Sequence, residues 1–366
     1  MAEIRIEHLQ KAFGNLTAVR GSTFTVRDGD FFCLLGPSGC GKTTTLRMIA
    51  GLELPTAGRI LLGGEDVTFK RASQRDIAFV FQLFALYPHM NVRANIAYPL
   101  RCQGMRRDEV KRRVEEAARI LRITGLLDRP VSGLSSGDRQ RVALGRAIVR
   151  EPLAFLLDEP LGALDAEFRD VMCGELRALH DRLHATTVYV THDQLEAMSM
   201  ADTIALMNNG VIEQLGPPQD IYDRPASLFV ADFIGSPPMN FVPFRGRVAP
   251  GDRSVRIADV EIALPELREG GADADLALGV RPEHVQLVAN APFRAEVVDA
   301  EYLGTTQIVT LATAAGARVK ARIAADVRVL PGEHTGLAFR PGKLSLFDRA
   351  SGRALRSALH DEARHG

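Results

Sequence analysis

One glycine-rich segment constrains the fold of this chain more than any other feature. The apolar run Phe31 to Leu35 is followed by Gly36-Pro37-Ser38-Gly39-Cys40-Gly41-Lys42-Thr43, and a helical pattern extends from Thr44 to Ala50. The three glycines allow positive φ angles that turn successive backbone N–H groups inward, and a helix that starts near Lys42 directs its positive end to the same place. The segment therefore predicts an α/β fold with a cradle for a polyphosphate.

Two side chains of this loop suit a nucleotide that carries a metal ion. Lys42 can reach the β- and γ-phosphates, and the hydroxyl of Thr43 can take one position on Mg²⁺. A glycine-rich turn without a ligand is the alternative. The strand before the loop and the helix after it argue against that alternative.

Composition excludes several classes of function. A length of 366 residues, at about 150 residues per domain, suggests two or three domains. Lys plus Arg and Asp plus Glu both number 45, so the neutral total gives no sign of binding to nucleic acid or to an anionic membrane. The four cysteines lack C-x-x-C spacing, which fits reduced thiols in a cytoplasmic protein. The start lacks a signal-peptide core, and no apolar run is long enough to span a membrane.

Two acidic residues follow a second buried strand. The apolar run Leu153 to Leu157 leads directly into Asp158 and Glu159. The first acid can hold Mg²⁺ through water beside Thr43, and the second can orient or deprotonate an attacking water. A strand that ends in Asp-Glu is common by itself, but after a phosphate loop it indicates phosphoryl chemistry.

Polar residues also follow two further apolar strands. Gln82 comes after Ile77 to Phe81, and His192 comes after Thr187 to Thr191. Ligand-binding groups of an open α/β sheet gather beyond the carboxyl ends of its strands, so we expect both side chains at the edge that carries the phosphate loop. For Gln82, a plain turn residue is the alternative.

The middle of the chain predicts an inserted layer of helices. Asn91 can cap a helical region over residues 91–127, in which apolar residues recur at helical spacing between residues 108 and 121. We interpret the Arg- and Lys-rich runs there as solvated faces. Leu134-Ser135-Ser136-Gly137-Asp138 then opens a helix over residues 139–149, where Ser135 can bind an anion or only cap the helix.

An aromatic residue lies in the turn between the first two predicted strands. Ile4 to Leu9 and Ser22 to Val26 form these strands, and Gly14-Asn15 marks the turn that contains Phe13. Phe13 can fill the core or stack on an adenine ring, and the sequence leaves both open. A further hairpin is predicted around Asn208-Asn209-Gly210.

The character of the chain changes after Ile234. Gly235-Ser236-Pro237-Pro238 forms a linker-like break, and short β-type runs follow it at residues 255–257, 307–311, 319–323 and 344–347. We therefore expect an α/β domain over residues 1–235, with a helical subdomain near 91–150, and a small all-β barrel over residues 236–350. The tail 351–366 is expected to be disordered.

In order and spacing, these motifs together resemble an ATP-binding cassette (ABC) ATPase. The resemblance covers residues 4–235, and the segment Leu134 to Asp138 separates it from other phosphate-loop proteins. It implies a cassette ATPase that binds ATP and Mg²⁺. It also implies a homodimer that encloses two ATP molecules, with each phosphate loop facing Leu134 to Asp138 of the other subunit. We call this segment the signature segment.

The resemblance also assigns roles to the candidate residues. It implies ATP binding by Phe13, which would stack on adenine, and by Gly36, Pro37, Ser38, Gly39, Cys40, Gly41, Lys42, Thr43, Thr44, Gln82, Asp158 and His192. Mg²⁺ would be held by Thr43, Gln82 and Asp158, partly through water. Glu159 would be the general base, with Gln82 and His192 sensing and clamping the γ-phosphate. Contacts to the opposing nucleotide would come from Ser135, Ser136, Gly137 and Asp138, and Asp165 would lie at the dimer contact.

The whole chain also resembles the ATPases of bacterial importers of the maltose and glycerol-3-phosphate type, which add a C-terminal β domain of the TOBE or OB type. Gly235-Ser236-Pro237-Pro238-Met239-Asn240 is the most telling stretch, joined by Gly279 to His284 and Tyr302-Leu303-Gly304. The resemblance implies two transmembrane permease subunits, a periplasmic or lipid-anchored solute-binding protein, no nucleic acid, and a peripheral place on the cytoplasmic face of the inner membrane. We expect Gln82 and the helical layer after it to form the surface that meets the permease, because Phe84 to Tyr87 is an apolar run in a predicted loop and would be an exposed patch.

Other functions stay open at this point. The same motor role for a polyamine, iron, sulfate or phosphonate is one alternative, and a cassette ATPase without a transport role is a more remote one. A β domain that binds a signalling protein or a small molecule is compatible with the transport role.

Three positions depart from the family pattern. Ser136 stands where glycine is usual, Asp138 where glutamine is usual, and Gly162-Ala163 where Ser-Asn is common. We expect the Cβ of Ser136 to crowd the opposing nucleotide or to strain a left-handed backbone. We expect a smaller effect from the charge of Asp138, because it is partly solvated. The predicted result is slower hydrolysis with unchanged affinity for ATP.

Overall fold

The computed structural model describes residues 2–162, 164 and 166–361, which form two compact units. The units divide between Pro218 and Gln219, upstream of the boundary that composition predicts after residue 235. Among the described residues, no helix combines the length and the apolar character needed to cross a bilayer.

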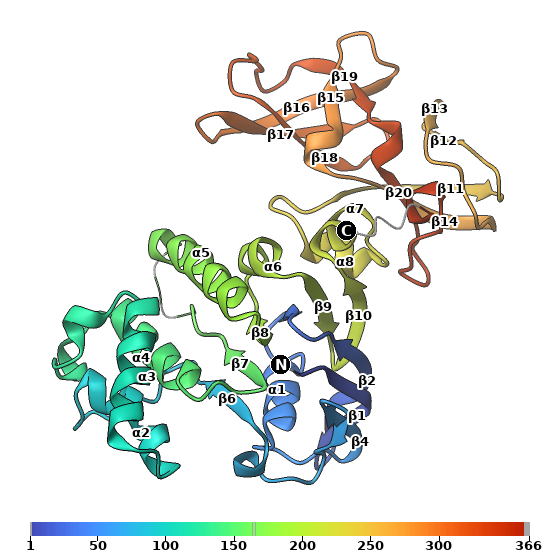
Figure 1. Cartoon of the computed structure of the whole chain (residues 1–366). Coiled ribbons are helices and arrows are strands. Elements are labelled where there is room, and N and C mark those ends of the chain that lie inside the picture. The colour runs from blue at the N-terminus through green and yellow to red at the C-terminus, as the bar shows by residue number, and fades with distance from the viewer. Residues whose placement is uncertain (1, 163, 165, 362–366) are drawn as a thin grey trace. The chain divides into compact units, whose positions relative to one another are not determined.

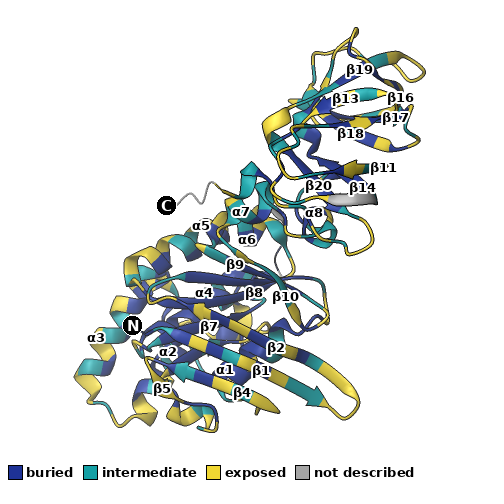
Figure 2. Ribbon diagram, turned by 90° about the vertical axis from the view of Figure 1, so that its right-hand side faces the viewer, coloured by how far each residue is buried: buried dark blue, intermediate teal, exposed yellow. Residues whose placement is uncertain are grey.

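A six-stranded sheet forms the centre of the first unit (Figure 1). Its order is β10-β9-β3-β8-β7-β6, and its strands are β3 (Phe31–Leu35), β6 (Ile77–Val80), β7 (Ala154–Asp158), β8 (Thr186–Thr191), β9 (Thr203–Asn208) and β10 (Val211–Gly216). All neighbours are parallel except β9 and β10, which form the hairpin predicted at Asn208-Asn209-Gly210. The strands β3, β7 and β8 are buried along their whole length. In Figure 2, β8 has the dark blue of buried residues.

A second, antiparallel sheet and helix α1 (Lys42–Ala50) complete this core. The sheet has the order β2-β1-β4-β5, with β1 (Ile4–Phe13), β2 (Leu16–Val26), β4 (Ala57–Leu62) and β5 (Glu65–Asp66). Leu46 and Ile49 of α1 share one hydrophobic cluster with residues of both sheets. The first two strands are longer than predicted. The turn between them consists of Gly14 and Asn15 alone, and Phe13 pairs with Leu16 across the two strands.

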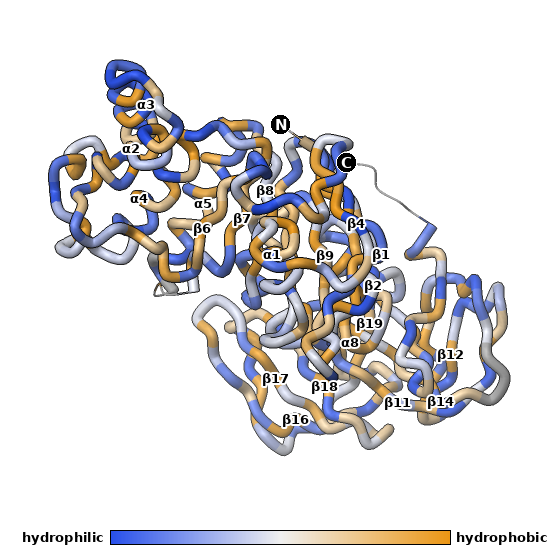
Figure 3. Tube along the Cα trace, turned by 90° about the horizontal axis from the view of Figure 1, so that it is seen from below, coloured by the Kyte–Doolittle hydropathy of each residue, from blue (hydrophilic) through white to orange (hydrophobic). Residues whose placement is uncertain are grey.

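The predicted helical layer consists of α2 (Val92–Cys102), α3 (Arg107–Ile120) and α4 (Ser136–Ile148), which gather on one side of the sheet in Figure 1. Asn91 caps α2 as predicted, because its side chain accepts a hydrogen bond of 2.8 Å from the backbone N–H of Ala94. Hydrophilic and hydrophobic residues alternate along α3 (Figure 3), and its charges pair within the helix, as Arg112 does with Glu109. The solvated-face interpretation of the charged runs is thus supported.

Further helices and turns connect the strands of the first unit. The helices α5 (Ala166–Leu183) and α6 (Gln194–Met200) flank β8 in the sequence. Leu176 and Leu179 of α5 line an apolar pocket together with Phe31 and Phe155 of the sheet, which places α5 against one face of the sheet. Three short 3-10 turns are η1 (Ala72–Gln74), η2 (Thr124–Leu126) and η3 (Val131–Gly133).

The second unit consists mainly of β-strands, as predicted. It begins with the short helices α7 (Pro218–Asp223) and α8 (Leu228–Phe233). Its three sheets are β11-β14-β20, β12-β13 and β15-β19-β16-β17-β18. The strands are β11 (Asn240–Val248), β12 (Ser254–Ile257), β13 (Val260–Ala263), β14 (Gly271–Val280), β15 (Val285–Leu287), β16 (Phe293–Tyr302), β17 (Thr306–Thr313), β18 (Arg318–Ala324), β19 (His334–Phe339) and β20 (Leu344–Asp348), with 3-10 turns η4 (Pro282–His284), η5 (Pro341–Lys343) and η6 (Ala358–His360). All ten strands contribute to one hydrophobic cluster.

Buried Arg281 explains why residues 219–235 belong to the second unit. Its guanidinium donates hydrogen bonds to the backbone carbonyls of Tyr222 (2.8 Å) and Ala231 (3.2 Å), and it lies 4.0 Å from the ring centroid of Tyr222. Arg281 follows β14, so it ties α7 and α8 to the β-strands. Sequence composition changes at residue 235, but these contacts reach across that point.

The C-terminal tail is not disordered up to residue 361, contrary to the prediction. Its backbone forms β-bridges from Arg353 to Ser227, from Ala354 to Phe347 and from Ser357 to Leu267. Ala354 and Ser357 are buried. The tail is ordered because backbone groups elsewhere in the unit supply its hydrogen-bond partners, which composition does not reveal. Residues 362–366 lie outside the described residues.

Candidate active site

The phosphate loop connects β3 to α1, as predicted. Gly36, Gly39 and Gly41 have φ angles of 152°, 79° and 109°. Close contacts also require two of these glycines. An ideal Cβ on Gly36 would lie 2.2 Å from the carbonyl oxygen of Met207, and one on Gly41 would lie 2.5 Å from that of Ala18. Met207 belongs to β9 and Ala18 to β2, so both sheets fix the path of the loop.

Lys42 is buried at the first position of α1. Its Nζ donates hydrogen bonds of 2.8 Å to the carbonyl oxygens of Gly36 and Pro37. The ammonium group therefore lies within the loop. A phosphate oxygen is a stronger acceptor for an ammonium than a carbonyl oxygen, so these bonds can be exchanged for bonds to a bound phosphate.

Thr43 meets the first of the two acidic residues. Its Oγ1 donates a hydrogen bond of 2.9 Å to Oδ1 of Asp158, the last residue of β7. Burial raises the pKa of the Asp158 carboxyl above its ordinary value, and the bond from Thr43 partly opposes that shift. A hydroxyl beside a carboxylate is a set of hard oxygen ligands, so this pair fits the predicted Mg²⁺ site.

Glu159 lies between the two other predicted side chains. Its Oε2 accepts a hydrogen bond of 3.2 Å from Nε2 of Gln82, and its Oε1 lies 3.4 Å from Nδ1 of His192. The backbone of Glu159 is left-handed, with φ of 44°, and its N–H donates to the carbonyl of Val190 on β8. A non-glycine residue held in this region is typical of a functional site. Three strand ends thus converge on one carboxylate.

Three residues that the sequence analysis did not single out hold the residues on either side of His192. Nη1 of Arg169 on α5 forms an ion pair with Oδ2 of Asp193 at a distance of 2.9 Å. Glu196 is buried, and its Oε2 accepts a hydrogen bond of 2.7 Å from the hydroxyl of Thr191. Burial raises the pKa of the Glu196 carboxyl. The sequence did contain a signal for these residues. Glu196 follows Asp193 by three positions, and this spacing is similar to that of a capping box at the start of a helix.

The segment after β6 differs from its prediction. Phe84 and Ala85 both have a left-handed backbone, with φ of 61° and 47°, which turns Phe84 inward so that it is only 7 % exposed. Leu83 is 83 % exposed instead. The apolar patch predicted at Phe84 to Tyr87 is therefore wrong in its first residue, and Leu83 is the most exposed large apolar side chain of the described segment.

The signature segment forms the start of α4. Oγ of Ser135 accepts a hydrogen bond of 3.1 Å from the N–H of Asp138 and donates one of 2.8 Å to its Oδ2, so Ser135 is the N-cap. Ser136 is the first helical residue and is not among the residues with positive φ. The predicted strain at Ser136 is therefore wrong, because a right-handed helical backbone accommodates a Cβ. Within the described residues, the signature segment forms no hydrogen bond or ion pair with the phosphate loop, Glu159 or His192.

Two candidates lie at the periphery of this site. Phe13 is 47 % exposed, and Nζ of Lys11 lies 4.7 Å from its ring centroid. The core-filling alternative for Phe13 is thus wrong. Asp165 lies outside the described residues. The nearby segment passes beside the Glu159 pair, since an ideal Cβ on Gly162 would lie 3.8 Å from Oε2 of Glu159 and 3.9 Å from Nε2 of Gln82.

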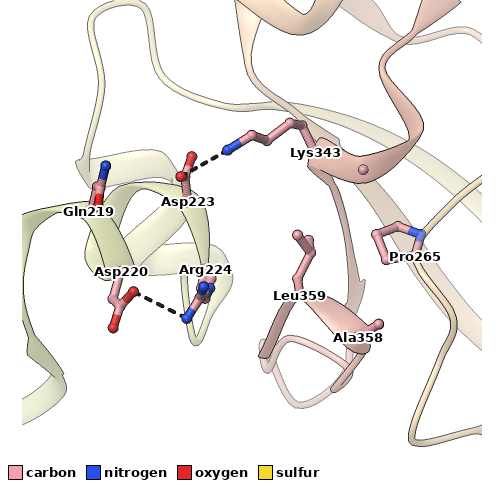
Figure 4. Close-up of a pocket in the computed structure, with 9 residues that line it drawn as sticks. Gln219, Asp220, Asp223, Arg224, Pro265, Lys343, Ala358 and Leu359 are labelled. Atoms are coloured by element: carbon pink, nitrogen blue, oxygen red, sulfur yellow. Dashed lines mark hydrogen bonds and ion pairs between the residues drawn. The ribbon is translucent and has the colours of Figure 1, made fainter. Parts of the chain in front are cut away.

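A separate pocket of about 310 Å³ lies in the second unit (Figure 4). Lys343 and Asp223 face each other across it at 2.9 Å, and Asp220 pairs with Arg224 at 3.3 Å. No predicted site residue lines this pocket. Its charges neutralise one another, so it offers no net attraction to a nucleotide.

Comparison with known families agrees with this division of the chain. The ABC transporter family matches residues 19–162, the MalK OB fold domain matches residues 235–285, and the TOBE domain matches residues 278–347. The first match includes the phosphate loop, Gln82, the signature segment and Asp158-Glu159. The other two lie in the β-rich second unit.

Individual relatives match along almost the whole chain. The trehalose/maltose import ATP-binding protein MalK of Thermococcus litoralis is 46 % identical over 375 residues, which cover 97 % of this chain and 100 % of the relative. The sn-glycerol-3-phosphate import ATP-binding protein UgpC of Cereibacter sphaeroides is 44 % identical over 357 residues, which cover 97 % and 100 %. A solved dimeric bacterial ABC transporter cassette matches with a TM-score of 0.53 and 28 % identity over 59 % of this chain and 98 % of the cassette. The chain thus belongs to the ATP-binding proteins of ABC transporters and is an ATPase.

Proposed function

We propose that this chain hydrolyses ATP to drive the import of a sugar or of glycerol 3-phosphate through a separate membrane permease. The convergence of Gln82 and His192 on Glu159, next to the Thr43–Asp158 pair, carries the catalytic part of the proposal. The import part is supported by the relatives, whose names specify trehalose/maltose import and sn-glycerol-3-phosphate import.

ATP binding would begin at the phosphate loop. The inward N–H groups of the loop and the ammonium of Lys42 would hold the β- and γ-phosphates. The exposed ring of Phe13 would stack on adenine. Thr43, Asp158 and Gln82 would hold Mg²⁺, partly through water, and the bound ion neutralises charge that develops on the phosphates.

Glu159 would act as the general base. A water between its carboxylate and the γ-phosphate would donate one proton to Glu159, while its oxygen bonds to phosphorus and the bond to the β-phosphate oxygen breaks. Gln82 would orient this water through its side-chain amide, since it already contacts Glu159 at 3.2 Å. His192 would donate to a γ-phosphate oxygen and hold the phosphate in line with the water.

A second copy of the chain would complete each site. The signature residues Ser135, Ser136, Gly137 and Asp138 make no contact with their own catalytic groups among the described hydrogen bonds and ion pairs, so they are available to a partner's nucleotide. One of the similar solved structures is a dimeric cassette. Asp165 is proposed to lie at the same homodimer contact.

The chain would work as a peripheral subunit on the cytoplasmic face of the inner membrane. Its partners would be two transmembrane permease subunits and, through them, a solute-binding protein. Exposed Leu83, next to Gln82, is the side chain that we propose to contact the permease.

The test is hydrolysis of ATP by the purified chain with Mg²⁺, alone and with its co-expressed permease. We expect Lys42→Ala and removal of Mg²⁺ to abolish hydrolysis, and the control Lys111→Ala on α3 to retain it. Hydrolysis that survives Lys42→Ala would overturn the catalytic proposal. Uptake of labelled trehalose and of glycerol 3-phosphate by vesicles with the whole transporter tests the solute class, and uptake of neither would reject it.

A further inference from the structure

Arg146 of α4 is bonded to the segment that carries Gln82. Its Nη1 donates a hydrogen bond of 2.6 Å to the carbonyl oxygen of Ala85, and its Nη2 donates one of 2.9 Å to that of Phe84. The guanidinium carbon also lies 5.5 Å from the ring centroid of Tyr87. We call these contacts the Arg146 clamp. Its two planar donors fix two successive carbonyls at once.

The clamped residues are those with the least favourable backbone in the segment. Phe84 and Ala85 are consecutive non-glycine residues in the left-handed region. A Cβ makes that region costly, so such a pair persists only where other contacts hold it. The side chain of Phe84 is buried and restrains the first residue of the pair, but Ala85 is exposed, so packing of its side chain does not restrain the second. The clamp is the interaction in the described residues that acts on both carbonyls.

Partial burial of Arg146 makes the clamp stronger and its loss more costly. Burial lowers the pKa of Arg146, and no acidic side chain within the described residues forms an ion pair with it. The backbone carbonyls of Phe84 and Ala85 are therefore the principal acceptors for this cation. A half-buried cation is favoured in the conformation that supplies such acceptors.

The far end of the same segment is fixed by another residue. Asn95 of α2 is fully buried, and its side chain accepts a hydrogen bond of 2.8 Å from the N–H of Tyr87 and donates one of 3.1 Å to its carbonyl. Gln82, at the near end, contacts Glu159. The left-handed pair Phe84–Ala85 lies between these two ends.

Helix α4 connects the clamp to the signature segment. Ser136 and Arg146 lie at opposite ends of this helix, ten residues and about 15 Å apart. A helix moves as a rigid rod over this length. A shift of Ser135 or Gly137 toward a partner's nucleotide would therefore move Arg146, and with it the carbonyls of Phe84 and Ala85.

We propose that Arg146 is a positioning residue that couples the signature segment to the Gln82–Glu159 pair within one subunit. The left-handed pair Phe84–Ala85 is the element with two states. With the Arg146 clamp formed, Gln82 contacts Glu159. With the clamp broken, the backbone of Phe84 and Ala85 leaves the left-handed region and Gln82 moves away from Glu159. The proposal rests on the proposed function, because it takes Gln82 and Glu159 as parts of the hydrolytic site.

The first experiment separates positioning from nucleotide binding. Arg146→Met should lower kcat roughly ten-fold or more while KM for ATP changes less than about two-fold, because a displaced catalytic group slows the chemical step without removing the phosphate loop. Arg146→Lys should give an intermediate value, since one ammonium cannot hold two carbonyls in the same geometry. Arg150→Met is the matched control, because Arg150 donates to Ile77 at the start of β6 and not to the clamped pair. Its kcat should stay near the wild-type value.

The second experiment tests the backbone mechanism by rescue. Ala85→Gly removes the Cβ that makes the left-handed conformation costly, so it should restore most of the kcat lost in Arg146→Met. In the otherwise wild-type chain it should change kcat less than about two-fold, because the clamp already holds the pair. If Arg146 were needed only for folding, glycine would not restore kcat. Should Arg146→Met fail to fold, the same rescue is measured on Arg146→Lys.

The third experiment reads the segment without any turnover. The chain contains no tryptophan, so Leu83→Trp introduces a single fluorophore beside Gln82. Its steady-state anisotropy should fall when Arg146→Met is added and should stay unchanged when Arg150→Met is added. An unchanged anisotropy in Arg146→Met, a wild-type kcat in that variant, or a failure of Ala85→Gly to restore kcat would each overturn the clamp. Absence of hydrolysis in the wild-type chain would instead contradict the proposed function, and the anisotropy would still test the clamp.

Discussion

The hydroxyl of Thr43 donates a hydrogen bond of 2.9 Å to the carboxylate of Asp158, although the two residues are 115 positions apart in the chain. They meet because β3 and β7 both pair with β8 in parallel, which brings their carboxyl ends to the same edge of the sheet. The contact joins the phosphate loop to the acidic strand end.

Glu159→Gln should retain ATP binding while lowering turnover by roughly a hundred-fold or more, because only the proton acceptor is lost. The introduced amide has the same shape, so the contact with Gln82 can persist. The ATP-bound dimer should then accumulate. Equilibrium binding of ATP and sedimentation velocity with ATP measure both effects. A variant that stays monomeric with ATP, or that turns over near the wild-type rate, would contradict the role of Glu159.

Ser136→Gly should leave the ATPase rate within about two-fold of wild type, since helical Ser136 has no left-handed strain to relieve. Asp138→Gln should have the larger effect and raise the rate. The Asp138 carboxylate accepts the only proton of the Ser135 hydroxyl, and in the proposed dimer it would add negative charge near the partner's phosphates. A partly solvated charge of this kind is worth about 0.5 kcal/mol, or roughly a two-fold change in rate.

The measurement for this pair is the ATPase rate of each single variant and of the double variant with the permease present. A large increase from Ser136→Gly would show that the helical geometry at this position changes in the closed dimer. A decrease from Asp138→Gln would show that its ion pair with Arg141 is needed in the dimer.

Leu83→Cys should cross-link to the permease, because this side chain is 83 % exposed beside Gln82. The background should carry Cys102→Ser, since Cys102 is exposed while Cys33, Cys40 and Cys173 are buried. Val298→Cys in the second unit is the control with an exposed position. Cross-links from the control alone would place the permease contact elsewhere.

Asp158→Asn should change how stability depends on pH. An ordinary Asp has a pKa of about 3.9 when unfolded, and burial raises the pKa of Asp158 in the folded protein. The folded state therefore holds this proton more tightly, so the contribution of Asp158 to stability is fully present below the unfolded pKa and is lost as pH rises through the folded pKa. The variant should gain stability relative to wild type across that window and keep a constant advantage above it. Chemical unfolding with a metal chelator present, at several pH values from about 3.5 upward, measures this difference. A difference that does not vary with pH would contradict it.

Deletion of residues 351–366 should destabilise the second unit by about 2 kcal/mol, because buried Ala354 and Ser357 and their β-bridges are lost. The exposed pair Arg268–Asp361 should contribute little to this loss. Thermal unfolding of the full chain measures the effect, and deletion of residues 362–366 alone isolates the contribution of residues 351–361. An unchanged unfolding temperature in the longer deletion would restore the prediction of a disordered tail.

The sequence alone determined the features that depend on one short segment. The phosphate loop is recognisable because its glycines, Lys42 and Thr43 act on one ligand from neighbouring positions in one strand-loop-helix unit. Ligand-binding groups of an open α/β sheet gather beyond the carboxyl ends of its strands. This tendency predicted that Gln82, Asp158, Glu159 and His192 lie at one edge, because parallel strands align their ends. The Asn91 cap and the β-rich second unit followed from equally local patterns.

Only the tertiary structure decided which of these groups touch and which backbone they adopt. That Glu159 lies between Gln82 and His192 depends on the strand order, which local periodicity does not specify. The inward turn of Phe84 and the ordered tail depend on contacts with residues far away in the sequence. Arg146 carried no signal of its own, since an arginine on an amphipathic helix is usually a solvated charge. Its proposed role depends on folding, which brings the carbonyls of Phe84 and Ala85, two residues with a left-handed backbone, within reach of its guanidinium.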